Sequence, residues 1–170
     1  GKKILRVGLL NAVTRLDPLD SFDHACVVVQ RQLYEAPFEL RSRGPVPALF
    51  EDDLEDLGNG RLRGRLRDDI RLSDGTPLDA GMAAAALGRS RTLAQRIVVG
   101  AEGEDLIFEA ETGARDVSVE LSKIWSVIAI PSGGRLLGTG PFMVADDATP
   151  ERMRLVRNPH HARHPALVDE

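Results

Sequence analysis

Residues 61–72, RLRGRLRDDIRL, restrict the possible folds more than any other part of this 170-residue sequence. The aliphatic side chains fall at even-numbered positions: Leu62, Leu66, Ile70 and Leu72. The arginines fall at odd-numbered positions: Arg61, Arg63, Arg65, Arg67 and Arg71. A period of two places successive side chains on opposite faces of a β-strand. We therefore predict a strand with one face in the core and a basic face toward solvent.

Turn and cap signals lie on both sides of this strand. Gly58-Asn59-Gly60 precedes it and predicts a β-hairpin, because these residue types adopt the turn conformations that hairpins require. Ser73-Asp74-Gly75-Thr76 supplies turn residues after it. Asp79 can then cap an alanine-rich helix by accepting backbone N–H bonds, and Leu78 can pack on its first turn. We interpret the unit as a structural joint whose helix lies flat against the sheet.

The basic face of this strand has two readings. A row of arginines could bind phosphate, or it could be the solvated side of a half-buried sheet. The second is favoured because carboxylates stand nearby to neutralise it: Asp52, Asp53, Glu55, Asp56, Asp68 and Asp69. The formal net charge of −4 also argues against nucleic acid as the main partner, because phosphate binding requires an excess of positive charge.

The rest of the chain suggests one domain with more strand than helix. We predict a strand at 4–10 that runs into a loop, and a helix at 21–35 capped by Ser21 or Asp23 and stopped by Pro37. Residues 40–52 are interpreted as a connector, because Gly44, Pro45 and Pro47 lie close together. Further hairpins are predicted from strands at 106–110 and 117–121, and from strands at 142–145 and 153–156.

Candidate chemical sites are few. Cys26 is the sole cysteine, so no internal disulfide can form, and its apolar neighbours predict a small core residue rather than a nucleophile. Gly138-Thr139-Gly140-Pro141 lacks the lysine of a phosphate-binding loop. His160, His161 and His164 could bind a metal, but the flanking prolines favour a solvated tail. We predict no catalytic residue, no metal ligand and no cofactor, and an enzyme finds no support.

No run of residues approaches the roughly 20 apolar positions that a bilayer-spanning helix needs. The start of the chain, GKKILRVGLL, lacks the features of a complete secretory signal. Either the chain is not exported or it is a trimmed mature form. Aromatic residues make up only 4% of the sequence, so flat stacking surfaces for ligands are scarce.

Four segments, taken in order, resemble the extracellular solute-binding proteins of peptide-type ABC transporters, the family 5 class of dipeptide, oligopeptide and nickel binders. LRVGLLNAVTRLDPLDSFD resembles the family's first strand and its Leu-Asp-Pro loop, and VVQRQLYEAPFE resembles the next helix, which ends in Tyr-Glu. PALFEDDLEDLGNGRLRGRLRDDIRLSDGTPLDAGMAAAAL carries the most specific match, with its Leu-Arg-Asp and Asp-Gly-Thr-Pro-Leu motifs. GTGPFMVADDATPERMRLVRNPHH resembles the Gly-Thr-Gly-Pro-Tyr strand and the Arg-Asn-Pro close.

The resemblance implies an α/β (mixed α+β) fold, a periplasmic-binding-protein-like lobe with a mixed sheet, β-hairpins and flanking helices. Residues 1–170 would form a single N-terminal lobe, with the second lobe absent. The region between Ser90 and Gly138 is shorter than in the family. Leu72 stands where the family often has phenylalanine, and His161 with Ala162 replaces its Tyr-Trp. These departures thin the aromatic contacts that a ligand would meet.

The function implied by the resemblance is substrate binding for a peptide-type ABC importer, without catalysis. Expected partners are a peptide or small solute, an ABC permease complex, and a second lobe of the same protein or of a partner chain, with no nucleic acid. The expected location is periplasmic or extracellular, with lipoprotein anchoring left open. Two loops would face the ligand: Asn11, Ala12, Thr14 and Leu16 in one, and Thr139 and Gly140 in the other. The same residues have a simpler reading, in which they only shape turns.

Two other functions stay open at this point. The chain could be a regulatory or interaction domain derived from a solute-binding lobe that has lost transport, for example as a ligand sensor in a larger cytoplasmic protein. The absent signal and thinned aromatics favour that alternative. A hydrolase with an unrecognised site is the third. Neighbouring genes would separate the first two: permease and ATPase genes indicate an importer, and a DNA-binding or signalling fusion indicates a sensor.

Overall fold

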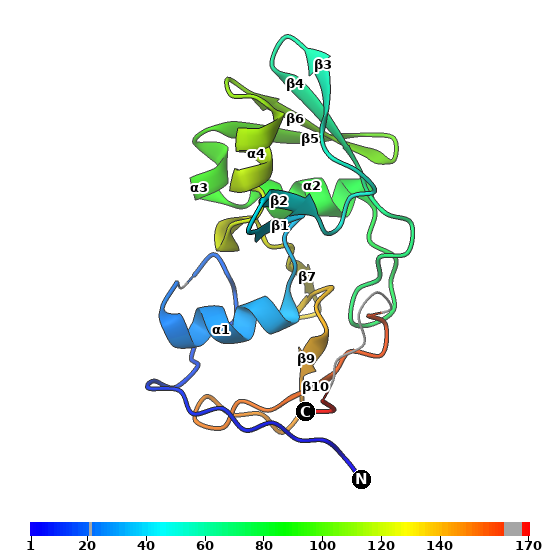
Figure 1. Ribbon diagram of the computed structural model, residues 1–170. Helices are drawn as coiled ribbons and strands as arrows, with labels where there is room; N and C mark the ends of the chain where they lie inside the picture. Colours follow the sequence, from blue (N-terminus) through cyan, green and yellow to red (C-terminus); the bar gives the residue numbers. More distant parts are fainter. Residues whose placement is uncertain (21, 162–167) are drawn as a thin grey trace.

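A computed structural model describes residues 1–20, 22–161 and 168–170 and shows two packed regions (Figure 1). The first region follows helix α1 (His24–Leu33) along the chain and is built around a four-stranded sheet. Its elements are β1 (Phe38–Arg41), β2 (Gly44–Pro47), β3 (Glu55–Gly58), β4 (Arg61–Arg65), α2 (Ala80–Gly88), α3 (Arg91–Ala94), β5 (Ile97–Glu102), β6 (Asp105–Ala110) and α4 (Ala114–Glu120). A 3-10 turn, η1 (Ile124–Ser126), leads out of it.

The second region combines the two ends of the described chain with α1. It contains β9 (Phe142–Val144) and β10 (Leu155–Arg157), which pair antiparallel. The hairpin of β7 (Ile130–Ser132) and β8 (Arg135–Leu137) leads into it from the first region. Helix α1 packs against β9, and the N-terminal segment runs past this region (Figure 1). Its core includes Cys26, Val29 and Leu33, so the prediction that Cys26 is a small core residue is confirmed.

The four-stranded sheet has the order β3-β4-β6-β5, and every strand pairing described in the protein is antiparallel. The predicted fold class, a mixture of helices and strands, is therefore confirmed. The predicted mixed sheet is wrong, because the described strands pair only in antiparallel fashion. The Gly58-Asn59-Gly60 hairpin is also confirmed, and all three of its turn residues have positive φ. Leu62 and Leu66 are buried, whereas the arginines between them point outward, as the period-two pattern predicts.

Aromatic rings fill the centre of the first region. Phe50 makes an edge-to-face contact with Phe38 at a centroid distance of 5.7 Å and a tilted contact with Phe108 at 6.1 Å. Gly64 in β4 lies directly against the Phe50 ring: a Cβ atom there would come within 2.6 Å of Phe50 Cε2. The glycine therefore lets the ring sit flat on the strand, and the three phenylalanines join the sheet to the β1–β2 hairpin.

Helix α2 lies across the sheet and contacts β5 and β6 through an alanine-rich face (Figure 1). Ala83 is fully buried, and a side chain this small allows close approach of helix and sheet. The Asp79 carboxylate accepts a hydrogen bond of 2.8 Å from the Met82 amide, which confirms the predicted cap. The turn and the capped helix are therefore as predicted, but the strand is shorter: β4 ends at Arg65, and residues 66–72 add only isolated bridges at Leu66 and Arg71.

We expect Asp79→Ala to lower the free energy of unfolding by about 1 kcal/mol, because the first turn of α2 loses the acceptor for the Met82 amide. Urea denaturation followed by circular dichroism measures the change. Asp79→Asn keeps a side-chain acceptor and serves as the control, with most of the stability retained. Equal losses in the two variants would contradict a capping role.

Three further local predictions were wrong. Residues 117–120 belong to helix α4 and Leu121 is its C-cap, so this segment forms no strand; Val117 and Leu121, four residues apart, are both fully buried on one side of the helix. Residues 40–52 hold most of the β1–β2 hairpin rather than a plain connector; its turn enters β2 at Gly44, whose φ is +117°. Residues 4–10 form no strand, although the Leu5 amide does donate to the Glu170 carbonyl.

Strand β5 was not predicted from the sequence, because its residues IVVGAE follow a short helix without a clear turn signal. The predicted hairpin of 142–145 and 153–156 is confirmed with slightly different bounds, as β9 and β10. The predicted helix at 21–35 is confirmed as the shorter α1, capped by Asp23, whose carboxylate accepts from the Cys26 amide at 3.1 Å. Within the described residues, no helix is both long and apolar enough to cross a bilayer.

Candidate functional site

The corner at residues 138–141 is the point where the two packed regions are tied together. The Gly140 amide donates to the Leu33 carbonyl at the end of α1, at 2.9 Å. The Gly138 carbonyl accepts from the Ser73 amide in the turn before α2, also at 2.9 Å. The buried Asn158 side chain donates to the Gly140 carbonyl at 2.8 Å. Three segments that are distant in sequence therefore meet at this corner.

The two glycines of the corner are required by the close approach of α1. A Cβ atom on Gly138 would lie 2.0 Å from the Leu33 carbonyl oxygen, and one on Gly140 would lie 2.4 Å from the Gln32 carbonyl oxygen. These neighbours are backbone atoms, which cannot rotate away as a flexible side chain can. The Gly-x-Gly pattern therefore has a packing function here, independent of any ligand.

Thr139, between the two glycines, is 2% exposed and holds two neighbouring elements. Its hydroxyl donates to Glu35 Oε1 at 3.0 Å, and its carbonyl oxygen lies 2.8 Å from His161 Nδ1. Because the carbonyl can only accept, Nδ1 of His161 carries the proton in this contact. The His161 side chain is only 6% exposed, so the predicted solvated tail is wrong for this residue.

The metal reading of the histidines finds no support in the part of the chain that the structure describes. Among those residues, no group of three or more His, Cys, Asp or Glu side chains is placed to hold a metal ion. His160 lies half-buried beside the turn at Gly75, apart from the Thr139 contact that His161 makes. His164 lies outside the described residues.

The Leu-Asp-Pro loop is fixed by side chains from two helices. The Asp17 carboxylate receives a hydrogen bond of 2.8 Å from Arg89, the C-cap residue of α2. The Asp17 carbonyl receives one of 3.3 Å from the buried Gln30 of α1. Asp17 also accepts from the Leu19 amide at 2.9 Å, which closes the local turn. The loop is therefore held rigidly between the two regions, and Leu16 immediately precedes this anchor.

A cavity of about 470 Å³ opens beside the corner and the loop. Its apolar wall includes Leu16, Leu33 and Phe142, and its polar groups come from separate elements: Tyr34, Ser73, Asp74, Arg135 and Asp146. Ligand pockets commonly have volumes of roughly 300–1,000 Å³ with a few polar groups on an apolar lining. The cavity has that size and chemistry, and it lies where α1, β7–β8 and β9 converge.

Six residues in two loops were expected from the sequence to face the ligand, and the structure places them at different sites. Leu16 lines this cavity, and Gly138, next to Thr139, lines it too. Thr139 and Gly140 are buried and are not among the residues that line it. Asn11 and Ala12 line a different groove near Pro150, and Thr14 is exposed. The two expected loops thus approach each other at Leu16 and the corner, whereas the start of the first loop faces elsewhere.

Tyr34, Asp74, Arg135 and Asp146 were not singled out as site residues from the sequence. Tyr34 ends α1 and is 4% exposed; burial, followed by the nearby charge of Asp17, raises the pKa of its hydroxyl well above the usual range. It therefore stays neutral and can donate a hydrogen bond at any physiological pH. The Asp74 carboxyl has a lowered pKa because it accepts hydrogen bonds from Thr76. For Tyr34, the Tyr-Glu pair at the end of the predicted helix was the sequence signal that could have identified it.

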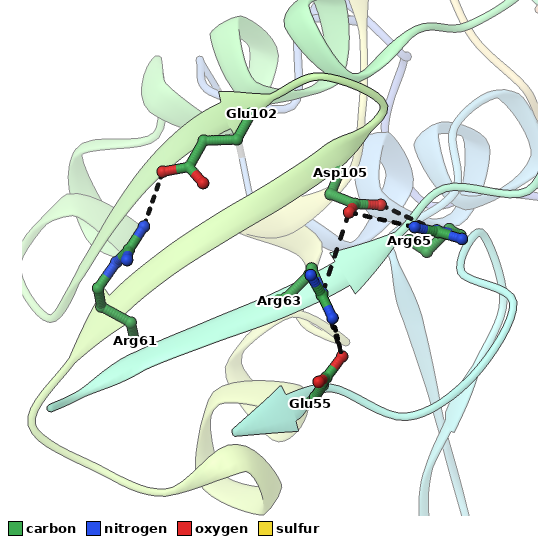
Figure 2. Close-up of polar contacts among 6 residues, drawn as sticks. All are labelled: Glu55, Arg61, Arg63, Arg65, Glu102 and Asp105. Atoms are coloured by element: carbon green, nitrogen blue, oxygen red, sulfur yellow. Dashed lines mark hydrogen bonds and ion pairs between the residues drawn. The ribbon is translucent and has the colours of Figure 1, made fainter. Parts of the chain in front are cut away.

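The basic face of β4 is neutralised by carboxylates of the other three strands of the sheet, as Figure 2 shows. Arg61 pairs with Glu102 of β5 at 2.7 Å, and Arg63 pairs with Glu55 of β3. Arg65 pairs with Asp105 of β6 at 3.0 Å, and Arg63 approaches the same carboxylate at 3.9 Å. The interpretation as a solvated, charge-balanced sheet face is confirmed for the arginines drawn. Two of their three acidic partners, Glu102 and Asp105, were not among the carboxylates expected from the sequence.

No family model matches the sequence, and no curated protein matches it. Solved structures do resemble the fold. The OppA protein of Listeria monocytogenes bound to peptide aligns over 96% of this chain and 40% of its own, with a TM-score of 0.78 and 14% identity. An ABC transporter substrate-binding protein from Sinorhizobium meliloti aligns over 97% and 38%, with a TM-score of 0.78 and 18% identity.

A nickel-related protein gives a similar result. NikA from Staphylococcus aureus, in complex with Ni(L-His)2, aligns over 94% of this chain and 36% of its own, with a TM-score of 0.76 and 17% identity. The chain thus spans well under half the length of these three proteins. Its fold is that of one part of the substrate-binding proteins of ABC transporters, shared across nearly all of its length.

Proposed function

We propose that this chain is one lobe of the substrate-binding component of a peptide-type ABC importer. The observation that supports this most is the fold likeness to OppA and to other substrate-binding proteins over more than nine-tenths of the chain. In this proposal the described residues supply one wall of a ligand site, and a second lobe, in the same protein or a partner chain, supplies the other. The component works outside the cell or in the periplasm, delivers its solute to a permease complex and catalyses no reaction.

The cavity beside Leu16 and the corner is our candidate for the ligand wall. Tyr34 and Ser73 offer hydroxyl groups, and Arg135 offers a guanidinium that suits a carboxylate. Asp74 and Asp146 offer acceptors for an ammonium group or for peptide N–H groups. A small peptide carries both kinds of charge and a polar backbone, so its chemistry complements this set. The corner and the Leu-Asp-Pro loop would keep the wall rigid while a second lobe closes over it.

We expect the isolated chain to bind free peptides only weakly, because one wall buries only part of a ligand. Calorimetry with a mixed library of short peptides should show dissociation constants of roughly 1 mM or weaker, or no measurable heat. Micromolar binding by the isolated chain would contradict the one-wall arrangement.

Saturation-transfer NMR detects such weak binding from the side of the peptide. We expect a signal with the unmodified chain and a clearly smaller one with Arg135→Ala, which removes the cationic group of the cavity. Arg91→Ala, at the exposed first residue of α3, is the matched control and should leave the signal unchanged. Equal signals for both variants would remove the cavity from the proposal, and no signal from the unmodified chain would count against solute binding itself.

A further inference from the structure

The Tyr34 side chain is buried, yet its hydroxyl has no hydrogen-bond partner within the part of the chain that the structure describes. Buried tyrosine hydroxyls usually find a partner. Other buried hydroxyls of this protein do: Thr139 donates to Glu35 at 3.0 Å, and Ser126 donates to the Glu120 carbonyl at 2.8 Å. The Tyr34 oxygen is also not one of the fully buried side-chain atoms without a partner, so it borders open space. The hydroxyl is therefore free to bind a solute.

Two cavities meet at Tyr34. It lines the cavity of about 470 Å³ described above, and it lines a second cavity of about 510 Å³ together with Lys123 and Pro141. After burial, the negative charge of Asp17 is the second cause of the raised pKa of the Tyr34 hydroxyl. Asp17 directly follows Leu16, which lines the first cavity, whereas no described residue of the Leu-Asp-Pro loop lines the second. The hydroxyl therefore faces the candidate ligand wall.

The Tyr34 ring is held in place by the corner. A Cβ atom on Gly138 would lie 2.5 Å from Cδ1 of Tyr34, so the ring packs directly on this glycine. The Tyr34 amide donates to the Gln30 carbonyl at 2.9 Å, which anchors the backbone to α1. A donor that is held in this way loses little conformational freedom when a solute binds, so its hydrogen bond forms at a low entropic cost.

The charges around Tyr34 indicate which atom of a solute it binds. Asp17 acts on this hydroxyl even though Arg89 pairs with it at 2.8 Å. An anionic oxygen at the hydroxyl would therefore meet a like charge, which costs free energy in a site with little water. A neutral carbonyl oxygen accepts the same hydrogen bond without this repulsion. The charged ends of a peptide suit the charged side chains that line the cavity: Asp74, Arg135 and Asp146.

We infer that Tyr34 selects solutes that bring a neutral carbonyl oxygen into the cavity, where its hydroxyl donates a hydrogen bond to that oxygen. The inference rests on the proposed function, because it assigns a role within the same cavity. Water can accept from the hydroxyl while the cavity is open, but a solute that displaces this water without an acceptor leaves the hydroxyl unpaired. Sites of this kind discriminate strongly against analogues that lack the matching group.

Tyr34→Phe tests, without any solute, whether the hydroxyl is unpaired in the protein. Because no protein partner is lost, the folding equilibrium constant should stay within about 2-fold of the unmodified value. Ser126→Ala also removes only a buried hydroxyl and is the matched control; it should lower the constant about 5-fold, because the bond to the Glu120 carbonyl is lost. Urea denaturation measures both variants. An equal loss in the two would show that the Tyr34 hydroxyl has a structural partner and would overturn the inference.

Saturation-transfer NMR with acetyl-alanyl-alanine amide, which carries neutral carbonyl groups and no charge, tests the selection. We expect a signal from the unmodified chain, a signal at least ~5-fold smaller from Tyr34→Phe, and no change in the control Arg91→Ala. With acetate, a carboxylate that has no neutral carbonyl, Tyr34→Phe and the unmodified chain should give equal signals.

The outcomes of this experiment separate the inference from the proposed function. This inference alone is overturned by a capped-dipeptide signal that Tyr34→Phe leaves intact, by a loss confined to acetate, or by a signal from the mixed short peptides with none from the capped dipeptide. If the unmodified chain gives no signal with either the capped dipeptide or the mixed peptides, the proposed solute binding is overturned as well.

Discussion

Gly138→Ala is expected to lower the free energy of unfolding by about 3 kcal/mol, and Gly140→Ala by a similar amount. The added methyl group would lie 2.0 Å from the Leu33 carbonyl oxygen at the first position and 2.4 Å from the Gln32 carbonyl oxygen at the second. Neither oxygen can move without displacing the end of α1. The displacement would also strain the hydrogen bonds from the Gly140 and Ser73 amides that join the two regions.

Gly88→Ala is the matched control for these two changes. Gly88 is the exposed last residue of α2 and has no atom within 4 Å of its Cβ position. Alanine there should be neutral or stabilise the protein by up to about 1 kcal/mol, because it restricts the unfolded chain and favours the helix. Urea denaturation of the three variants gives the comparison. Similar stabilities for Gly138→Ala and Gly88→Ala would show that the corner is not packed as described.

Phe50→Ala is expected to cost about 3–5 kcal/mol, the range for removing a fully buried aromatic side chain. Phe50 is 1% exposed and contacts the rings of Phe38 and Phe108, so its loss opens a cavity between the sheet and the β1–β2 hairpin. Gly64 beneath the ring has no side chain that could fill the space. Thermal unfolding by calorimetry measures the effect.

Phe22→Ala provides the control for Phe50→Ala. Phe22 is 51% exposed, and its truncation should change the stability by less than about 1 kcal/mol. If the two variants lost equal stability, the aromatic cluster could not be the centre of the first region. If Phe50→Ala kept the unmodified stability, the core would lie elsewhere.

Local patterns in the sequence predicted the first region best where two signals agreed. Strand β4 combines strict alternation with a Gly-Asn-Gly turn, and α2 combines an aspartate cap with an alanine-rich helix. The failures occurred where one residue pattern fits two structures. Residues 117–121, VSVEL, alternate like a strand, but Val117 and Leu121 are also one helical turn apart, and tertiary burial decided for the helix.

The candidate site was harder to predict because it depends on contacts between distant segments. From the sequence, Leu16 and the Gly-Thr-Gly-Pro corner were expected near each other, and the structure brings Leu16 and Gly138 to one cavity. It did not find Asp74, Arg135 or Asp146, whose approach is set by the packing of α1 against the corner. No local pattern in the sequence records that packing, since the two glycines contact α1 across about 100 residues of chain.

The most direct test of the ligand wall is a chemical-shift map of the ¹⁵N-labelled chain titrated with a mixture of short peptides. We expect shifts at about 1–10 mM peptide that concentrate at Leu16, Tyr34, Ser73 and Arg135 and stay small on β5 and β6. Shifts confined to the sheet face or to the groove near Pro150, or none at ~10 mM peptide, would contradict the proposed ligand wall.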